Sequence, residues 1–300
     1  MKKNLEVRLT HSAIIITQRC TMKCKRCVAY SPYYTNKAYY TLEEVSRNID
    51  AYFDVVDYVD KFTVTGGEPL LHKELPSIIE KLMEYQGRYR KVEIFTNATL
   101  FFSEELQHCI KKNKEYLTFW IDNYGKISKQ YENLVEWLTK EKVDFVTKKY
   151  YGADAFAGGW VDFGDYSQKA FTEEEIKQRF AKCHYPKVQF NFGMWAGEMF
   201  PCARTHRLME LGIIPKNPKE YVDLYNQKET IEEKKQKIID ILKTDRLTTC
   251  AYCNGLCQDS QRFMPAEQLT GEELLCIKEG ARNSHEIDEM MKKKENTNEK

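Results

Sequence analysis

Apolar and polar residues follow two different rhythms along the first half of the chain. Some runs are rich in Ile, Val, Thr and aromatic residues, as β-strands are, and the stretches between them space apolar residues three and four apart, as amphipathic helices do. Strands are predicted at 7–17, 61–65, 91–97, 116–122 and 143–149, and helices at 41–57, 75–85, 103–112 and 134–139. Strands that alternate with helices form parallel sheets, so the pattern predicts an α/β fold.

The pattern changes near residue 152, where glycines and short polar segments replace the regular alternation. Capping boxes that begin at Thr172 and Thr230 predict two helices. A short hairpin is predicted around Gly197, from strands at 188–192 and 198–200. After about residue 284 the chain is charged and has no clear apolar face, so we expect a helical end that frays into a partly disordered tail. The predicted units are 1–152, which can extend to about 180, then 183–280, and the tail at 284–300.

The composition narrows the classes of protein that the chain fits. About 42% of the 300 residues are apolar, and 46 Lys and Arg nearly balance 45 Asp and Glu, which argues against a general nucleic-acid binder. No run approaches the roughly 18 apolar residues of a membrane span. We therefore expect a cytoplasmic protein that binds neither nucleic acid nor membranes. Ten cysteines are many for such a protein, and in a reducing compartment clustered cysteines bind metal more often than they form disulfides.

Three of these cysteines, Cys20, Cys24 and Cys27, lie close together directly after the first predicted strand. Three thiolates on one loop can hold three irons of a cubane and leave the fourth iron open to a small molecule, whereas ferredoxin-type clusters use four cysteines. The same spacing also fits a zinc knuckle. No fourth ligand is close by, because His11 lies upstream on the strand and the next histidine is His72.

With this triplet and the segment Gly66-Gly67-Glu68-Pro69 after the second strand, the chain resembles the radical SAM superfamily over roughly residues 7–150. The resemblance implies a partial (β/α)6 TIM-like barrel with a small cysteine-rich α+β extension. It also implies that the glycines, Glu68 and Pro69 contact the methionine part of S-adenosylmethionine, and that Thr96, Asn97 and Asp122 contact its ribose or carboxylate. One departure concerns the residue before the third cysteine, which is usually aromatic and is Arg26 here. An Arg plane can also stack on a base.

The resemblance further implies the cofactors and the reaction. A [4Fe–4S] cluster on the three cysteines passes one electron to bound S-adenosylmethionine, and the resulting 5′-deoxyadenosyl radical abstracts hydrogen from a substrate carbon. An electron donor such as flavodoxin or ferredoxin is expected as a partner. The cofactor carries this chemistry, and the protein orients the reactants and excludes water.

A second group of cysteines lies in the later part of the chain and comprises Cys183, Cys202, Cys250, Cys253 and Cys257. Their spacing does not distinguish zinc from an iron–sulfur cluster, because both accept four thiolates. The pattern resembles the twitch and SPASM extensions of radical SAM enzymes, which implies an auxiliary [4Fe–4S] cluster on Cys183, Cys202, Cys250 and Cys253, with Cys257 as a substitute for one of them. Cys276 is interpreted as a buried apolar residue of a helix.

The substrate is less defined by the sequence. A fully ligated second cluster suits an oxidation, and we expect a carbohydrate-like small molecule as substrate, with a peptide that is crosslinked or epimerised as the alternative. Peptide-modifying relatives often carry an N-terminal peptide-binding domain, and Cys20 leaves no room for one here. A non-catalytic protein that binds zinc or a cluster is the third hypothesis. Arg204, His206 and Arg207 are candidates for binding an anionic group, and no catalytic acid or base is assigned.

Overall fold

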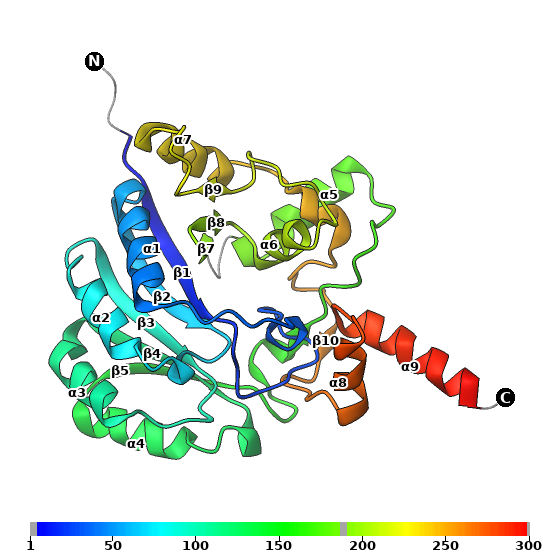
Figure 1. The fold of residues 1–300 in the computed structure, drawn as a ribbon, viewed down its shortest axis with the longest axis horizontal. Helices are drawn as coiled ribbons and strands as arrows, with labels where there is room; N and C mark the ends of the chain where they lie inside the picture. The colour runs from blue at the N-terminus through cyan, green and yellow to red at the C-terminus, as the bar shows by residue number, and fades with distance from the viewer. Residues whose placement is uncertain (1–4, 187–190, 299–300) are drawn as a thin grey trace.

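A mixed sheet of eight strands forms the centre of the computed structural model, which describes residues 5–186 and 191–298 (Figure 1). The strand order is β5-β4-β3-β2-β1-β7-β8-β9, in which β1 to β5 and β7 are parallel and the β8 and β9 pairings are antiparallel. The strands are β1 (Arg8–Thr17), β2 (Tyr58–Gly66), β3 (Tyr89–Thr96), β4 (Leu117–Asn123), β5 (Asp144–Lys149), β7 (Phe192–Trp195), β8 (Glu198–Phe200) and β9 (Val222–Asp223). The predicted α/β class and the parallel strands of the first half are confirmed.

Four helices connect the first five strands and lie along one side of the sheet, at the left and bottom of Figure 1. They are α1 (Leu42–Val55), α2 (Leu75–Met83), α3 (Glu104–Asn113) and α4 (Tyr131–Glu141). The capping box at Thr41 begins α1, where Thr41 and Glu44 bond each other's backbone N–H groups. The apolar face of α1, including Ile49, Tyr52 and Phe53, is buried against Phe62 of β2. Each such side chain stabilises the fold by about 1.5–3 kcal/mol through burial.

The sixth parallel strand occupies a position that the sequence did not predict. In a barrel built strand by strand it would follow β5, but β7 pairs with β1 instead, with Ser12 opposite Phe192 and Ile14 opposite Met194. The predicted hairpin around Gly197 is present, although its first strand begins at Phe192 rather than at 188, and residues 187–190 lie outside the described part of the chain. Gly197 has a φ of +82°, which the turn between β7 and β8 requires.

The later part of the chain packs beside this sheet, with α7 at the top of Figure 1 and the other helices farther to the right. Its helices are α5 (Glu173–Lys182), α6 (Ala203–Glu210), α7 (Ile231–Leu242), α8 (Gly271–Lys278) and α9 (Ser284–Asn298), and a separate antiparallel pair is formed by β6 (Trp160–Val161) and β10 (Arg262–Phe263). Short 3-10 helices occur at η1 (Ser31–Tyr33), η2 (Pro69–Leu71), η3 (Lys114–Tyr116), η4 (Gly125–Ile127), η5 (Phe156–Gly158) and η7 (Thr248–Tyr252). The capping boxes predicted at Thr172 and Thr230 are present and begin α5 and α7.

The segment after residue 284 is more ordered than the sequence indicated. It forms α9 as far as Asn298, and its first turns pack on α8, where Ile287 is fully buried with Cys276 and Ile277. One buried residue per few turns is enough to dock a helix, but so few apolar residues form only a weak pattern in the sequence. The sequence therefore led us to expect a fraying tail here. Cys276 is fully buried on α8, as its interpretation as an apolar residue required.

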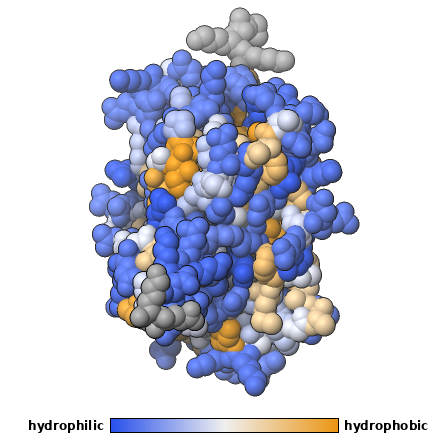
Figure 2. Space-filling model, turned by 90° about the vertical axis from the view of Figure 1, so that its right-hand side faces the viewer, coloured by the Kyte–Doolittle hydropathy of each residue, from blue (hydrophilic) through white to orange (hydrophobic). Residues whose placement is uncertain are grey.

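The surface has few apolar features. The face drawn in Figure 2 is mostly hydrophilic, with small and separate apolar patches. Within residues 5–186 and 191–298, no helix has the length and hydrophobicity needed to cross a bilayer.

Candidate cofactor site

The loop that carries the first three cysteines begins where β1 ends, and the glycines after β2 hold it in place. The N–H of Gly67 donates to the carbonyl of Thr17 at 2.8 Å, and the N–H of Glu68 donates to the carbonyl of Arg19 at 2.9 Å. A Cβ atom on Gly67 would clash with the Arg19 carbonyl oxygen and would lie 3.0 Å from Cβ of Cys20. The sequence suggested that these glycines admit a ligand, and in the structure they admit the cysteine loop itself.

The thiols of Cys20, Cys24 and Cys27 are free and pack in one cluster with Met22, Ala266, Tyr124 and Trp160. Burial raises the pKa of Cys20 to about 12 and raises that of Cys24 further, and the charge on Cys27 adds to both increases. Three thiolates so close together and so buried require a positive partner, and the irons of a cluster are such a partner.

Among the described residues, no three His, Cys, Asp or Glu side chains are placed to hold a single metal ion. The ligands of a cubane each bind a different iron and therefore do not converge on one point. The three thiols, of which Cys24 is buried and Cys20 and Cys27 are half-buried, fit the cluster in residue type.

Glu68 lies beside this loop and braces two strand ends. Its carboxylate is fully buried and accepts the N–H of Leu70 at 3.0 Å and the N–H of Asn97 at 2.8 Å. Burial raises the pKa of Glu68 to about 7, against the lowering effect of these hydrogen bonds. Pro69 begins η2 directly after it. This bracing role was not visible in the sequence, and the role of Glu68 in binding an ammonium group stays a prediction.

The other predicted contacts lie at the same edge of the sheet, because the carboxyl ends of parallel strands meet there. At the end of β3, the amide nitrogen of Asn97 donates to Sγ of Cys20 at 3.6 Å and to Thr21 at 3.1 Å, while the Thr96 hydroxyl accepts from Ala98. At the end of β4, Asp122 accepts from Trp120 at 2.7 Å, and burial raises its pKa to about 7. The structure therefore gathers Gly66 to Pro69, Thr96, Asn97 and Asp122 around the cysteine loop.

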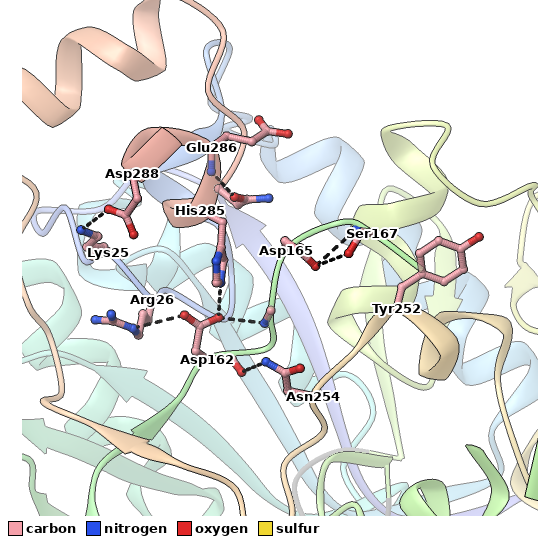
Figure 3. Close-up of polar contacts among 12 residues, drawn as sticks. Lys25, Arg26, Asp162, Asp165, Ser167, Tyr252, Asn254, His285, Glu286 and Asp288 are labelled. Carbon is pink, nitrogen blue, oxygen red and sulfur yellow. Dashed lines mark hydrogen bonds and ion pairs between the residues drawn. The ribbon is translucent and has the colours of Figure 1, made fainter. Parts of the chain in front are cut away.

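Arg26 contacts residues of the later part of the chain, which is called the extension below. Its guanidinium lies 4.1 Å from the ring centre of Phe263, forms an ion pair with Glu267, and lies 3.4 Å from Asp162. Figure 3 shows Asp162 between Arg26 and His285. A stacking role of Arg26 on adenine stays a prediction.

His285 is a further residue near the site that the sequence does not reveal, because a single histidine in a charged segment forms no motif. Its Nε2 lies 3.0 Å from Asp162, and this hydrogen bond raises the pKa of His285. Burial raises the pKa of Asp162, but the bond to His285 and the charge of Arg26 outweigh burial and lower it to about 2. The pair thus joins β6 to α9 beside the cysteine loop.

Four cysteines of the second group gather at the ends of short elements. Cys183 follows α5, Cys202 is the N-cap of α6, and Cys250 and Cys253 lie in and directly after η7. Burial raises the pKa of Cys250, and the charges of the other three thiols raise it further. Cys257 stands apart in its electrostatic surroundings, because the thiol charges that chiefly raise the pKa values of Cys202 and Cys250 come from other members of the group. Burial raises the pKa of Cys257, the charge of Cys183 raises it further, and its Sγ donates to the carbonyl of Arg179 at 3.8 Å.

Arg204 is a buried cation beside these four thiols and is only 3% exposed. It donates to the hydroxyl of Tyr30 at 3.2 Å and to the carbonyl of Tyr252 at 2.7 Å, and none of the described carboxylates forms an ion pair with it. Burial raises the pKa of Cys253, and the charge of Arg204 opposes this increase. A buried cation is costly without an anion, so Arg204 fits an anionic group held by the four thiols. His206, by contrast, stacks on Trp195, and burial lowers its pKa to about 4.

A cavity of about 440 Å³ opens between α5, the β6–β10 pair and α9. Its lining combines charged and amide side chains with two aromatic rings: Asp162, Arg179, Asn254, His285, Phe171 and Phe263. Cys257, which is not one of the four clustered cysteines, also lines this cavity.

Comparisons with known proteins match mainly the first half of the chain. Residues 14–143 match the family model of the Radical SAM superfamily. Among curated relatives, the GTP 3′,8-cyclase of Hydrogenovibrio crunogenus is 31% identical over 94 residues, which are 30% of this chain and 28% of that protein. The GTP 3′,8-cyclase of Sinorhizobium medicae is 28% identical over 185 residues, 59% of this chain and 49% of that protein. The matches thus span half or less of these relatives.

A solved structure, native anSMEcpe with bound AdoMet, superimposes with a TM-score of 0.50 at 15% identity and covers 83% of this chain and 89% of its own. At this identity the likeness concerns the fold alone.

Proposed function

We propose that this chain, whose residues 14–143 match the Radical SAM superfamily, holds a [4Fe–4S] cluster on Cys20, Cys24 and Cys27 and cleaves S-adenosylmethionine reductively. The observation that carries the proposal is the contact between the two motifs. Gly67 and Glu68 bond the backbone of the cysteine loop directly, and Asn97 reaches Sγ of Cys20 from the next strand. A structural zinc knuckle formed by the cysteines would not require the motif Gly66 to Pro69 to contact their loop.

The chain's own residues would bind and orient the cofactor. The backbone of Gly66 to Pro69 would face the methionine part, and Thr96, Asn97 and Asp122 would face the ribose or carboxylate. When bound, the cluster supplies the single electron that breaks the bond between sulfur and the 5′ carbon. The bound cofactor would thereby supply a hydrogen-abstracting 5′-deoxyadenosyl group, with methionine and 5′-deoxyadenosine as its products. The electron must come from a low-potential one-electron donor such as flavodoxin or ferredoxin.

We further propose that Cys183, Cys202, Cys250 and Cys253 hold an auxiliary [4Fe–4S] cluster, with Cys257 outside the ligand set. Burial raises the pKa values of Cys202 and Cys250, and the charges of neighbouring thiols of this group raise them further. These effects and the buried charge of Arg204 beside Cys253 support this assignment. In an oxidation, the substrate radical loses one electron and one proton. An auxiliary cluster held by these four cysteines would be suited to accept that electron.

For the substrate, we propose a carbohydrate-like small molecule that is oxidised at a carbinol carbon. The cavity beside the second cysteine group supports this class, because carboxylate, amide and guanidinium groups bind hydroxyl groups and aromatic rings pack against sugar faces. A guanosine nucleotide is the second candidate, and it rests on the relatives named GTP 3′,8-cyclase. A peptide is the third.

The experiment is anaerobic reconstitution of the full chain, followed by iron and zinc analysis and by reduction with dithionite in the presence of S-adenosylmethionine. We expect about eight irons per chain, as two [4Fe–4S] clusters require, and release of 5′-deoxyadenosine. Cys109→Ala is a matched control, because Cys109 is buried on α3 and outside both groups. Zinc in place of iron, or intact S-adenosylmethionine, would refute the proposal. Carbohydrate, nucleotide and peptide libraries then separate the substrate classes by the increase in 5′-deoxyadenosine that each causes.

A further inference from the structure

A segment of the extension crosses the first cysteine loop and pairs with its backbone. The N–H of Lys25 donates to the carbonyl of Glu267 at 2.7 Å, and the N–H of Leu269 donates to the carbonyl of Lys23 at 2.8 Å. Between these two bonds, Cys24 and Gln268 stand opposite each other in an antiparallel bridge. Residues more than 240 positions apart in the chain are thereby fixed side by side.

The orientation of the Gln268 side chain follows from its neighbours. The backbone N–H of Lys23 lies 2.8 Å from Oε1 of Gln268, and a backbone N–H only donates, so the atom facing it must be the amide oxygen. The amide nitrogen then points the other way, 3.2 Å from Sγ of Cys24 and 2.6 Å from the carbonyl of Ala266. Both amide hydrogens have acceptors, and one of these acceptors is a predicted cluster ligand.

Charged contacts hold the extension where this bond forms. Nζ of Lys25 lies 2.8 Å from both Glu273 of α8 and Asp288 of α9, and the Lys25 side chain is only 11% exposed. Arg26 pairs with Glu267 on the crossing segment. Because Cys24 itself is buried, water does not compete for its sulfur.

We propose that Gln268 is a positioning residue of the first cluster, and that its N–H···S bond to Cys24 raises the reduction potential of that cluster. The inference rests on the proposed function. Reduction adds negative charge that spreads onto the thiolate sulfurs, so a donor that faces a sulfur stabilises the reduced form, and hydrogen bonds to sulfur are among the determinants of cluster potential. The extension thus contributes to the start of the reaction as well as to the second cysteine group.

The test is an EPR-monitored redox titration of the reconstituted full chain. Gln268→Leu removes the donor, and the nearly isosteric Gln268→Glu replaces it with an acceptor while keeping an oxygen for Lys23. At a fixed solution potential we expect the ratio of reduced to oxidised first cluster to fall about 10-fold, which is about 59 mV for one electron. Gln236→Leu on α7, whose amide bonds Asp240 of its own helix, is the control and should leave the ratio unchanged.

A measurement on the wild-type chain does not depend on variants folding. With glutamine labelled by ¹⁵N in the side chain, pulsed EPR of the reduced first cluster should show a nitrogen coupling through the hydrogen bond. An iron-loaded chain that cleaves S-adenosylmethionine, shows no such coupling and keeps its potential in the Gln268 variants would overturn the inference alone. A chain that takes up no iron would instead refute the proposed function.

Discussion

The first cysteine group is built from one short loop, whereas the second is assembled from distant segments. Cys20, Cys24 and Cys27 lie within residues 20–27, and residues at the ends of β1, β2 and β3 hold this loop by hydrogen bonds. Cys183, Cys202, Cys250 and Cys253 come from the end of α5, the start of α6 and a 3-10 turn. The first group therefore depends on the sheet, and the second depends on how loops and helix ends pack.

This difference suggests a division of labour that mutations can test. A loop held by strand ends has little freedom to lose when a cofactor binds, whereas ordering separate segments carries a larger entropic cost. Breaking the first group should abolish the chemistry, and breaking the second should change only its outcome.

The largest effect is expected from Cys27→Ala, compared with Cys253→Ala. Without Cys27 a second iron, besides the open one, has no protein ligand, and 5′-deoxyadenosine formation should fall by more than the roughly 10–100-fold that loss of an outer partner of a metal site costs. Cys253→Ala should keep the first cluster, with iron falling from about eight to about four per chain, and should still release 5′-deoxyadenosine. Equal losses in both variants would show that the two groups form one functional unit.

The next comparison separates the members of the second group. Cys257→Ala should keep about eight irons per chain, because Cys257 lies apart from the four clustered thiols, whereas Cys250→Ala should lose about half. Iron analysis and Mössbauer spectroscopy measure this. If Cys257→Ala loses iron and Cys250→Ala does not, the ligand set assigned from the thiol positions is wrong.

A third prediction concerns the support of the first loop. Gly67→Ala places a methyl group against the Arg19 carbonyl and should lower the free energy of unfolding by about 1–3 kcal/mol, as overpacking does, and reduce iron loading. Gly271→Ala is the matched control, because a Cβ there meets open space at the start of α8. Urea denaturation and iron analysis measure both, and equal stability of the two variants would contradict the close approach at Gly67.

The smallest effect should come from the ion pair that joins the extension to the loop. His285 faces Asp162, Asp165 and Asp288, and Arg26 also faces Asp162. The pKa of His285 is raised, so its contribution is present below about pH 6.5 and is lost as pH rises through the folded pKa. The pKa of Asp162 is lowered to about 2, so its contribution is present above about pH 3.9 and is lost as pH falls toward 2.

His285 is partly exposed, so this pair should contribute at most about 1 kcal/mol. Unfolding in urea at pH 5.5 and pH 8 measures the effect, and wild type should lose more stability at pH 8 than His285→Gln does. An identical pH dependence of the two proteins would show that the contact between His285 and Asp162 does not contribute to stability.

Much of the first half could be predicted from the sequence, because its signals are local. The alternation of strands and helices in this half depends on neighbours a few residues away, and so do the capping boxes at Thr172 and Thr230 in the later half. The position of β7 next to β1 could not be predicted in this way, because the short strand carries no signal for its partner. The docking of α9 was missed for a similar reason, since it depends on few buried residues such as Ile287.

The sequence by itself determined the α/β class, the cysteine triplet and the glycine motif that follows one strand later, because in each the chemistry lies within a few consecutive residues. Only the tertiary structure decided that Gly67 supports the cysteine loop, that Cys257 lies apart from four other thiols, and that Gln268 faces Cys24. These relations join residues that are far apart in the chain. They follow from the packing of the extension on the sheet edge, which no local pattern of residues encodes.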